Sequence, residues 1–576
     1  MDKKILVIDD DLQLQNQRDV FCLNYPLEGY SYIFVADGKE AQKILQNNDE
    51  GISLILLDIR FEGMENNHGL RILSQLVESG CSIPIAMLSS ITDASVIIEA
   101  WQKGAKTYLV KWGENNNFYE QLREVVAQYA LAAKPSDRNL INIKRKRILT
   151  DTDNLLKTLK ACSLSDVIEA ANRLRDEVGA QWMHEIPFSE DFGNYINGWN
   201  STERELEDAT KKGKLLYLNM DFGDGCTLNC PHCFTKEGAI DERGREPLAY
   251  DLLKEQILEA RKLGLKAVRI LGRGEPTQWI SGDWKGSPEK GADLIDFIKF
   301  LRNNDIIPLI FTRGQILGDD SLIERFYGGA HGVRNGDGLA RLFRDFDVSV
   351  FLGFSSLFPP INNEMVGRGE RQNYDRTCRN AMRLLIKHGF NGENPTRMAV
   401  EAPITNLNIY YMLVRYVFFQ MLNISPCSNV YMVTGRTMTY RLGELSDPGQ
   451  AAFVEMYCAI TRFKQLMGIK GKIGSYAGIK ECHDVQFGMY LTLNGDIYPC
   501  PGYEGIHNYV GSLRSNSISE IWKNNPYAVH PQSICPPRIA THFPPDFERV
   551  IELKIHESSD RYDALFNDIY NGLRKG

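Results

Sequence analysis

The sequence predicts an α/β chain of several domains, in which a doubly wound parallel sheet precedes a larger α/β region and a small α+β region. Strand-length apolar runs alternate with helical stretches in the first 130 residues and again from about 214 to 470, a pattern typical of parallel sheets. Near the C-terminus, Asn494-Gly495 lies between two short apolar runs and indicates a hairpin. A length of 576 residues leaves room for three or four domains.

Polar side chains end each apolar run of the first region. Asp9 and Asp10 follow the run 4–8, and Asp58 follows 54–57. Ser89 follows 85–88, and Lys111 follows 108–110. Because the carboxyl ends of parallel strands meet at one edge, these side chains are expected to lie together. Carboxylates at that edge would hold Mg²⁺, which prefers oxygen ligands.

This set resembles a response-regulator receiver domain over about residues 1–130. The resemblance implies a flavodoxin-like fold, Asp9, Asp10 and Asp58 as Mg²⁺ ligands, and Asp58 as the phosphorylated residue. It further implies Ser89 as the switch hydroxyl, Lys111 as the phosphate contact, a sensor histidine kinase or other phosphodonor as partner, and a homodimer through the receiver as an option. The sequence departs from the family pattern at two places. The loop after Asp58 is lengthened and lacks the usual proline, and Trp112 replaces the proline that commonly follows the lysine. The alternative is a pseudo-receiver that serves as a docking or dimerisation platform.

Residues 131–213 are expected to form a helical linker. Apolar residues recur at helical spacing between Leu155 and Val178, which predicts one or two amphipathic helices. The linker would either couple the receiver to the next domain or recognise the substrate.

The core region, 214–470, shows about six strand–helix units. The expected strands are 215–220, 266–271, 307–311, 348–352, 397–401 and 430–433, and the expected helices include 371–388, 407–423 and 448–467. The glycine-rich stretch from Gly328 to Asp345 is interpreted as a loop-rich insertion and a candidate substrate lid.

Three cysteines follow the first of these strands at the spacing CxxxCxxC: Cys226, Cys230 and Cys233. Three thiolates so spaced suit three corners of one iron–sulfur cube, whose fourth iron stays open to another ligand. A structural zinc site is the alternative, but it would need a fourth ligand, and only His232 is near.

The motif resembles the radical S-adenosylmethionine (AdoMet) superfamily. Residues 272–276 resemble its GGEP turn with Arg273 in place of the second glycine, and 312–314 stand where the family has a TNG-like turn. The resemblance implies a partial (β/α)6 barrel and a [4Fe–4S] cluster that binds AdoMet, releases a 5′-deoxyadenosyl radical and takes electrons from a flavodoxin or ferredoxin. The cofactor contacts it implies are Phe234 on the adenine side, Gly272, Gly274 and Glu275 near the methionine amino group, Thr312 near the ribose, and in addition Pro276 and Ser355.

A second cysteine group, Cys482, Cys500 and Cys535, lies in the last region, 471–576. This region resembles the auxiliary-cluster domain of radical AdoMet enzymes, called SPASM in its seven-cysteine form and twitch when shortened. Three cysteines favour one auxiliary [4Fe–4S] cluster, whose fourth site is open or is filled by Cys427, Cys458 or His483. The alternative is a cluster-free domain with three buried thiols.

Composition limits the class of protein. A net charge of −8 gives no electrostatic support for general nucleic-acid binding. The charged residues near Met1 break any signal peptide, and the apolar stretch 410–424 is too short to span a membrane. A cytoplasmic protein with reduced thiols is therefore expected.

The expected function is a receiver-controlled radical AdoMet enzyme that abstracts hydrogen from a peptide or protein side chain. Oxidation of a small carbohydrate-like alcohol is the competing reaction. An iron–sulfur redox sensor without turnover is the competing class.

Overall fold

The computed structural model of the chain describes residues 3–12, 14–27, 29–47, 51–61, 68–81, 83–89, 100, 103–105, 107–110, 122–123, 125–126, 163–182, 196–221, 226–233, 247–271, 273–278, 293–367, 373–430, 447–467, 484–503, 509–528 and 547–575. The chain divides into two compact units. Unit 1 comprises 1–150 and 542–547, and unit 2 comprises 151–541 and 548–576.

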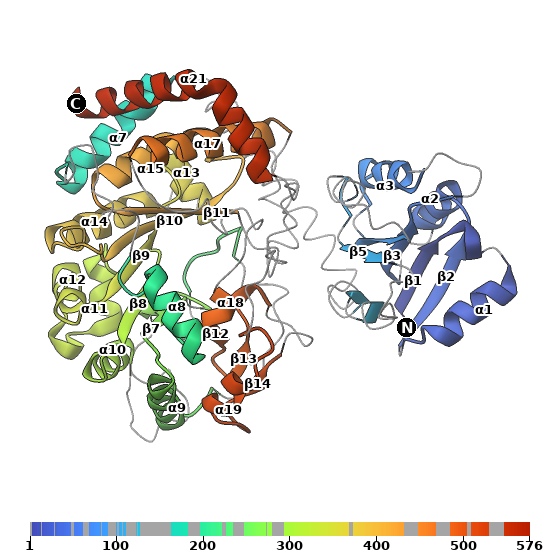
Figure 1. Ribbon diagram of the computed structural model, residues 1–576, viewed down its shortest axis with the longest axis horizontal. Helices are drawn as coiled ribbons and strands as arrows, with labels where there is room; N and C mark the ends of the chain where they lie inside the picture. The colour runs from blue at the N-terminus through green and yellow to red at the C-terminus, as the bar shows by residue number, and fades with distance from the viewer. Residues whose placement is uncertain are drawn as a thin grey trace. The chain divides into compact units, whose positions relative to one another are not determined.

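Unit 1 is built on a five-stranded parallel sheet with the strand order β2-β1-β3-β4-β5 (Figure 1). Its elements are β1 (Lys3–Ile8), η1 (Asp10–Leu12), α1 (Gln15–Asn24), β2 (Tyr30–Val35), α2 (Gly38–Asn47), β3 (Ile52–Asp58), α3 (His68–Glu78), β4 (Ile85–Ser89) and β5 (Thr107–Val110). All seven residues of β3 are buried, as expected for a central strand covered by helices on both faces. The strand order is that of the flavodoxin-like fold, so the predicted doubly wound sheet is confirmed.

Unit 2 contains a nine-stranded sheet with the order β11-β10-β9-β8-β7-β6-β12-β13-β14. Its strands are β6 (Tyr217–Met220), β7 (Ala267–Ile270), β8 (Ile307–Thr312), β9 (Ser349–Gly353), β10 (Met398–Ile404), β11 (Ser425–Val430), β12 (Gly488–Leu491), β13 (Asp496–Tyr498) and β14 (Gly511–Ser512). The strands β6 to β11 are parallel and follow one another in chain order. Their carboxyl ends therefore share one edge.

Helices precede and connect these strands. They are α8 (Glu203–Lys212), α9 (Tyr250–Lys262), η4 (Pro276–Gln278), α10 (Leu294–Asn303), α11 (Asp320–Tyr327), η5 (Ala330–Gly332), α12 (Gly336–Asp345), α13 (Pro359–Met365), α14 (Tyr374–Lys387), η7 (Ile409–Tyr411), α15 (Met412–Met421) and α17 (Asp447–Leu466). Those that form the large core cover one face of the sheet, whereas α8 packs through Ala209 with Ala267 on the other face. Val268 and Ile270 of β7 join the large core formed with these helices. Arg269, between them in β7, therefore lies on the other face, because strand side chains alternate.

Two helices from distant parts of the chain pack together in unit 2: α7 (Leu164–Val178) and α21 (Phe547–Lys575). Asn172 of α7 donates its side-chain amide to the carbonyl of Gly572 in α21, at 3.2 Å, and Figure 1 shows the two helices side by side. Ser163 starts α7 with a reciprocal capping box. The predicted amphipathic helix thus belongs to the core of unit 2.

The C-terminal strands continue the same sheet. The strand β12 pairs in parallel with β6, and β13 pairs with β12 through the predicted hairpin, whose Gly495 has a positive φ of 97°. The helix α18 (Asp484–Phe487) precedes β12, while η9 (Pro501–Tyr503) and α19 (Ile518–Lys523) follow β13.

Two local predictions differ from the structure. The stretch from Gly328 to Asp345 is largely helical, because Asn335 caps α12 and its apolar side chains are buried. The last parallel strand is 425–430 instead of 430–433, and 431–433 lie outside the described residues. Its apolar pattern is weak because β11 is an edge strand of the described sheet, where Pro426 is tolerated.

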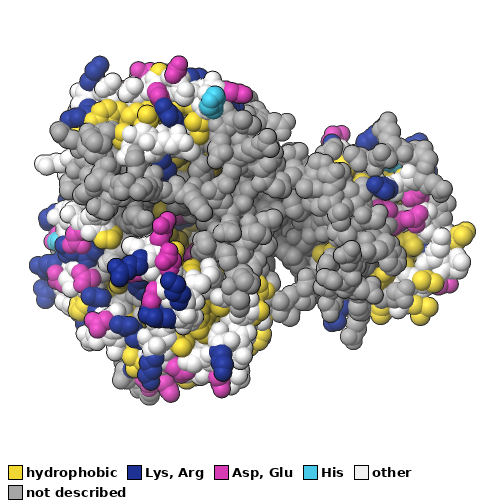
Figure 2. Space-filling model, viewed as in Figure 1, with side chains coloured by type: hydrophobic (Ala, Val, Ile, Leu, Met, Phe, Trp, Pro, Cys, Tyr) yellow, Lys and Arg dark blue, Asp and Glu magenta, His cyan; other side chains and the backbone are white. Residues whose placement is uncertain are grey.

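Charged side chains of both signs are interspersed over unit 2 on the face drawn in Figure 2. Among the described helices, none combines the length and apolarity needed to cross a membrane.

Candidate functional site

Three carboxylates meet at the carboxyl edge of the unit 1 sheet. Asp9 follows β1, Asp10 begins η1 and Asp58 ends β3, and one oxygen from each lies within 4.8 Å of the others. Asp9 and Asp58 are 2% and 5% exposed. The Asp58 carboxylate also accepts a hydrogen bond from the backbone N–H of Ile59, at 2.7 Å. Buried carboxylates repel one another unless a cation lies between them, so this donor set fits a hard cation such as Mg²⁺.

The neighbouring positions of this edge are partly described. The strand β4, which ends at Ser89, pairs with β3, whereas Lys111 lies outside the described residues. The chain returns after Asp58 at Gly69, where a Cβ atom would lie 1.9 Å from the Asp58 carbonyl oxygen. Only glycine permits this approach, so Gly69 holds the end of the lengthened loop against the phosphorylation candidate.

In unit 2 the cysteine loop, residues 226–233, follows β6 at the carboxyl edge. Cys226, Cys230 and Cys233 are each partly buried. The loop is tied to the second predicted motif because Gln278 donates its side-chain amide to the Thr227 hydroxyl, at 3.1 Å. The two motifs, about fifty residues apart in sequence, are therefore neighbours in space.

The other side of the cysteine loop contacts the turn after α13. The Asn229 N–H donates to the Val366 carbonyl at 3.3 Å. A Cβ atom on Gly367, whose φ is +68°, would lie 2.3 Å from the Asn229 carbonyl oxygen. The cysteine loop is thus held between η4 and this turn.

Glu275 joins the second and third motifs. Its Oε1 accepts hydrogen bonds from the hydroxyl groups of Thr277 and Thr312, both at 2.6 Å. Its Oε2 accepts from the backbone N–H of Arg313 at 2.8 Å. Glu275 is 4% exposed. These bonds replace the hydrogen bonds to water that its carboxylate loses on burial.

The predicted AdoMet contacts have the following places. Thr312 donates to Glu275 and accepts from the Gly314 N–H at 2.9 Å. Ser355 is buried and donates its N–H to the Asn362 side chain. Gly274 and Pro276 flank Glu275, whereas Phe234 and Gly272 lie outside the described residues.

Two residues at this edge, Arg313 and Tyr374, were missed in the sequence-based prediction. Arg313 Nη2 lies 2.9 Å from Nε2 of His232, inside the cysteine loop. Tyr374 donates its hydroxyl to the carbonyls of Arg313 and Gly353, at 3.0 and 2.8 Å. The unusual Thr312-Arg313-Gly314 turn was the available signal for Arg313, whereas no local pattern marks Tyr374.

The last cysteine group is described in part. Cys500 follows β13 and is partly buried, whereas Cys482, Cys535 and His483 lie outside the described residues. The other two candidates for the fourth cluster ligand are buried, Cys427 in β11 and Cys458 in α17. Burial raises the pKa of the Cys427 thiol to about 12, which opposes the thiolate form that a metal needs.

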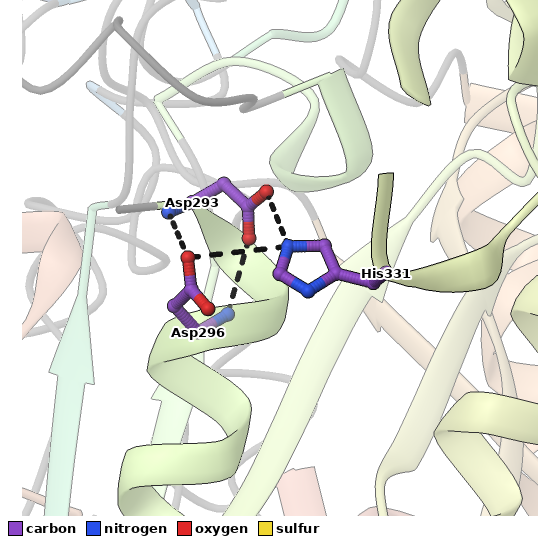
Figure 3. A group of neighbouring side chains, drawn as sticks. All are labelled: Asp293, Asp296 and His331. Atoms are coloured by element: carbon purple, nitrogen blue, oxygen red, sulfur yellow. Dashed lines mark hydrogen bonds and ion pairs between the residues drawn. The ribbon is translucent and has the colours of Figure 1, made fainter. Parts of the chain in front are cut away.

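A further group of ionisable side chains, Asp293, Asp296 and His331, lies at the start of α10 (Figure 3). Asp293 caps the helix through the N–H groups of Ile295 and Asp296. His331 Nε2 is 2.7 Å from the Asp293 carboxylate, and its Nδ1 is 3.1 Å from the ammonium of Lys299. Since an ammonium only donates, Nδ1 accepts and the proton resides on Nε2. The group is accounted for as a helix cap.

Comparison with known proteins identifies two parts of the chain. Residues 5–123 match the response regulator receiver domain family, and residues 482–536 match the iron–sulfur cluster-binding domain SPASM. The N-terminal part is therefore a receiver domain and the C-terminal part contains an iron–sulfur domain, as predicted. A receiver domain implies a phosphodonor such as a histidine kinase.

Similar proteins cover parts of the chain. The transcriptional regulatory protein DcuR of Escherichia coli (strain K12) is 32% identical over 119 residues, which is 20% of this chain and 48%, about half, of DcuR. The response regulator MprA of Mycobacterium sp. (strain KMS) is 23% identical over 231 residues, 38% of this chain and 94% of MprA.

Among solved structures, SuiB of Streptococcus suis aligns with 56% of this chain and 70% of its own, at 16% identity and a TM-score of 0.38. The Mn²⁺-bound response regulator Rcp1 aligns with 23% of this chain and 97% of its own, at 19% identity and a TM-score of 0.19.

Proposed function

We propose that the chain is a radical AdoMet enzyme whose activity is controlled by its receiver domain. The observation that carries this proposal is the cysteine loop at the carboxyl edge of six successive parallel strands. The loop contacts the turn of Glu275 through Gln278, and an iron–sulfur domain follows in the same chain. Parallel α/β sheets build their sites at this edge. The six strand–helix units are then the partial (β/α)6 barrel.

The residues present fit a [4Fe–4S] cluster with AdoMet. Three cysteine thiolates are the ligands that such a cluster takes when one iron stays open. When bound, the cluster with AdoMet would supply a 5′-deoxyadenosyl radical for hydrogen abstraction. Glu275 Oε2 accepts one hydrogen bond and has a second lone pair available for an ammonium group. The bonds from Thr312 and Arg313 would keep that carboxylate oriented.

The test is anaerobic reconstitution of the chain and of a variant with Cys226→Ala, Cys230→Ala and Cys233→Ala. About eight irons in the parent, about four in the variant, and 5′-deoxyadenosine only from the parent are expected with one auxiliary cluster. Equal iron in both proteins would refute the cluster assignment. Loaded clusters with no 5′-deoxyadenosine, with or without the phosphorylation mimic beryllofluoride, would favour the redox sensor.

We propose further that Asp58 is phosphorylated with Mg²⁺ held by Asp9, Asp10 and Asp58. A phosphoryl group adds negative charge and acceptor oxygens at this edge, and Ser89 and Lys111 would respond to it. Acetyl phosphate with Mg²⁺ should label the parent but neither Asp58→Asn nor a sample treated with a chelator. Unchanged labelling of Asp58→Asn would place phosphorylation elsewhere, and no labelling of the parent would favour the pseudo-receiver.

The proposed substrate is a peptide or protein side chain. A small carbohydrate-like alcohol is the competing substrate class, and the two are distinguished by which one stimulates 5′-deoxyadenosine formation.

A further inference from the structure

Arg313 places a guanidinium group beside the cysteine loop. Its Nη2 lies 2.9 Å from His232. Its Nη1 is buried and has no hydrogen-bond partner among the described residues. A buried donor without a partner costs free energy. A ligand beside the loop that supplies an acceptor to Nη1 would remove this cost.

The structure holds this side chain in one place. The Arg313 N–H donates to Glu275, and the Arg313 carbonyl accepts from Tyr374. The guanidinium packs over Gly353, where a Cβ atom would lie 2.6 Å from Arg313 Cδ and Nη1. A residue other than glycine at 353 would displace it. The backbone of Arg313 is therefore fixed by Glu275 and by the start of α14, and its side chain lies against Gly353 of β9.

The guanidinium of Arg313 carries a permanent positive charge. Glu401 lies directly across from Gly353 in the register of β9 and β10. Arg313 therefore brings a positive charge to the side of the cysteine loop that holds His232.

We infer that Arg313 is a positioning residue for the cysteine triad and that its positive charge raises the reduction potential of the cluster bound there. This inference rests on the proposed function. On reduction, [4Fe–4S]²⁺ takes one electron from the reductant and becomes [4Fe–4S]⁺, so the site gains one negative charge. A cation close to a buried cluster stabilises the reduced form more than the oxidised form.

The experiment is a redox titration of the full-length holoprotein, without AdoMet, followed by electron paramagnetic resonance. The signal absent from the triple cysteine-to-alanine variant is assigned to the triad. Arg313→Met and Arg313→Gln should lower the midpoint potential of the triad signal by at least about 59 mV. For one electron, this shift equals a tenfold change in the equilibrium constant of reduction. Glutamine can keep a hydrogen bond toward His232, so it separates loss of charge from loss of the contact. Arg313→Lys keeps the positive charge, so its midpoint potential should differ from that of the parent by less than half of that shift.

Arg397→Met is the matched control. Arg397 is also a buried arginine, but it pairs with Asp347 and Glu393 at the amino end of β10, so its removal should leave the triad potential unchanged. A wild-type potential in both charge-removing variants, with full triad iron, would overturn the inference and leave the proposed function intact. Absence of any triad-dependent signal in the parent would overturn the proposed function, and the inference with it.

Discussion

At the scale of single residues, Glu275 and Thr312 have a structural role that does not depend on a ligand. Glu275 is buried and accepts hydrogen bonds from two hydroxyl groups and two backbone N–H groups. Thr312 links it to β8. The carboxylate is therefore oriented before any ligand binds, which would reduce the cost of ordering the proposed AdoMet site.

Thr312→Val should destabilise unit 2 by about 1–3 kcal/mol. The substitution keeps the shape but removes the donor to Glu275 and the acceptor for Gly314, and buried unpaired groups cost about this much. Hydrogen exchange of β6 to β11 peptides in increasing denaturant measures the change. The control is Thr210→Val on the exposed surface of α8, expected within about 0.5 kcal/mol of the parent. Equal effects of the two substitutions would contradict the role of the Glu275 contact.

Cys427 should resist alkylation at pH 8 even in the iron-free protein, whereas the exposed Cys22 should react. Burial raises the Cys427 pKa to about 12, so roughly one thiol in ten thousand is ionised at pH 8. The thiolate fraction of Cys427 rises with pH, so its labelling should also increase with pH. Iodoacetamide labelling followed by mass spectrometry tests this. Labelling of Cys427 that appears only on iron removal would instead support a ligand role.

At the scale of elements, the cysteine loop depends on the turn after α13 as well as on its own sequence. Gly367 lets the two backbones approach, and Gln278 of η4 holds the loop from the other side. The chemistry predicted from the cysteine spacing therefore needs two elements that carry no metal ligand.

Gly367→Ala should displace the cysteine loop and reduce triad iron, up to about the four irons of one cluster. The added Cβ would clash with the Asn229 carbonyl. Gly389→Ala is the matched control, because Gly389 also has a positive φ, +73°, but no atom within 4 Å of the added Cβ. Both variants carry backbone strain, and only the first should lose iron. Normal iron in Gly367→Ala would show that the loop tolerates the shift.

At the scale of the whole molecule, the C-terminal region completes the sheet of unit 2. The strand β12 pairs with β6, and Tyr490 of β12 donates its hydroxyl to Asp221, just after β6, at 2.6 Å. Met489, Leu491 and Ile497 share one core with the parallel strands. The iron–sulfur domain and the strands β6 to β11 are thus expected to fold together.

A chain of residues 151–576 should fold, whereas a chain of 151–470 should not. The shorter chain lacks β12 to β14 and α21, which would leave the edge of β6 unpaired and part of the core exposed. Circular dichroism and size-exclusion chromatography distinguish a cooperative monomer from an aggregate. A soluble, cooperatively unfolding 151–470 fragment would contradict this view.

The parts that could be predicted are those with a local signal. The polar residues that end apolar runs predicted the acidic edge of unit 1, where Asp9, Asp10 and Asp58 meet, and Asn494-Gly495 predicted the hairpin. The helix α12 was missed because its glycine-rich start resembles a loop, although Asn335 caps it. The strand β11 was misplaced because an edge strand with a proline lacks the apolar pattern.

The sequence by itself determined the receiver domain, the spacing of the cysteine triad and the order of strands and helices, because these depend on periodicity and on neighbours along the chain. Only the tertiary structure decided the continuous nine-stranded sheet, the bond between Thr312 and Glu275 and the contact of Arg313 with His232. The Thr312–Glu275 bond joins residues 37 positions apart, the Arg313–His232 contact 81, and the Tyr490–Asp221 bond between β12 and the end of β6 269. Such pairs are selected by packing and by satisfaction of buried polar groups, which no local pattern encodes.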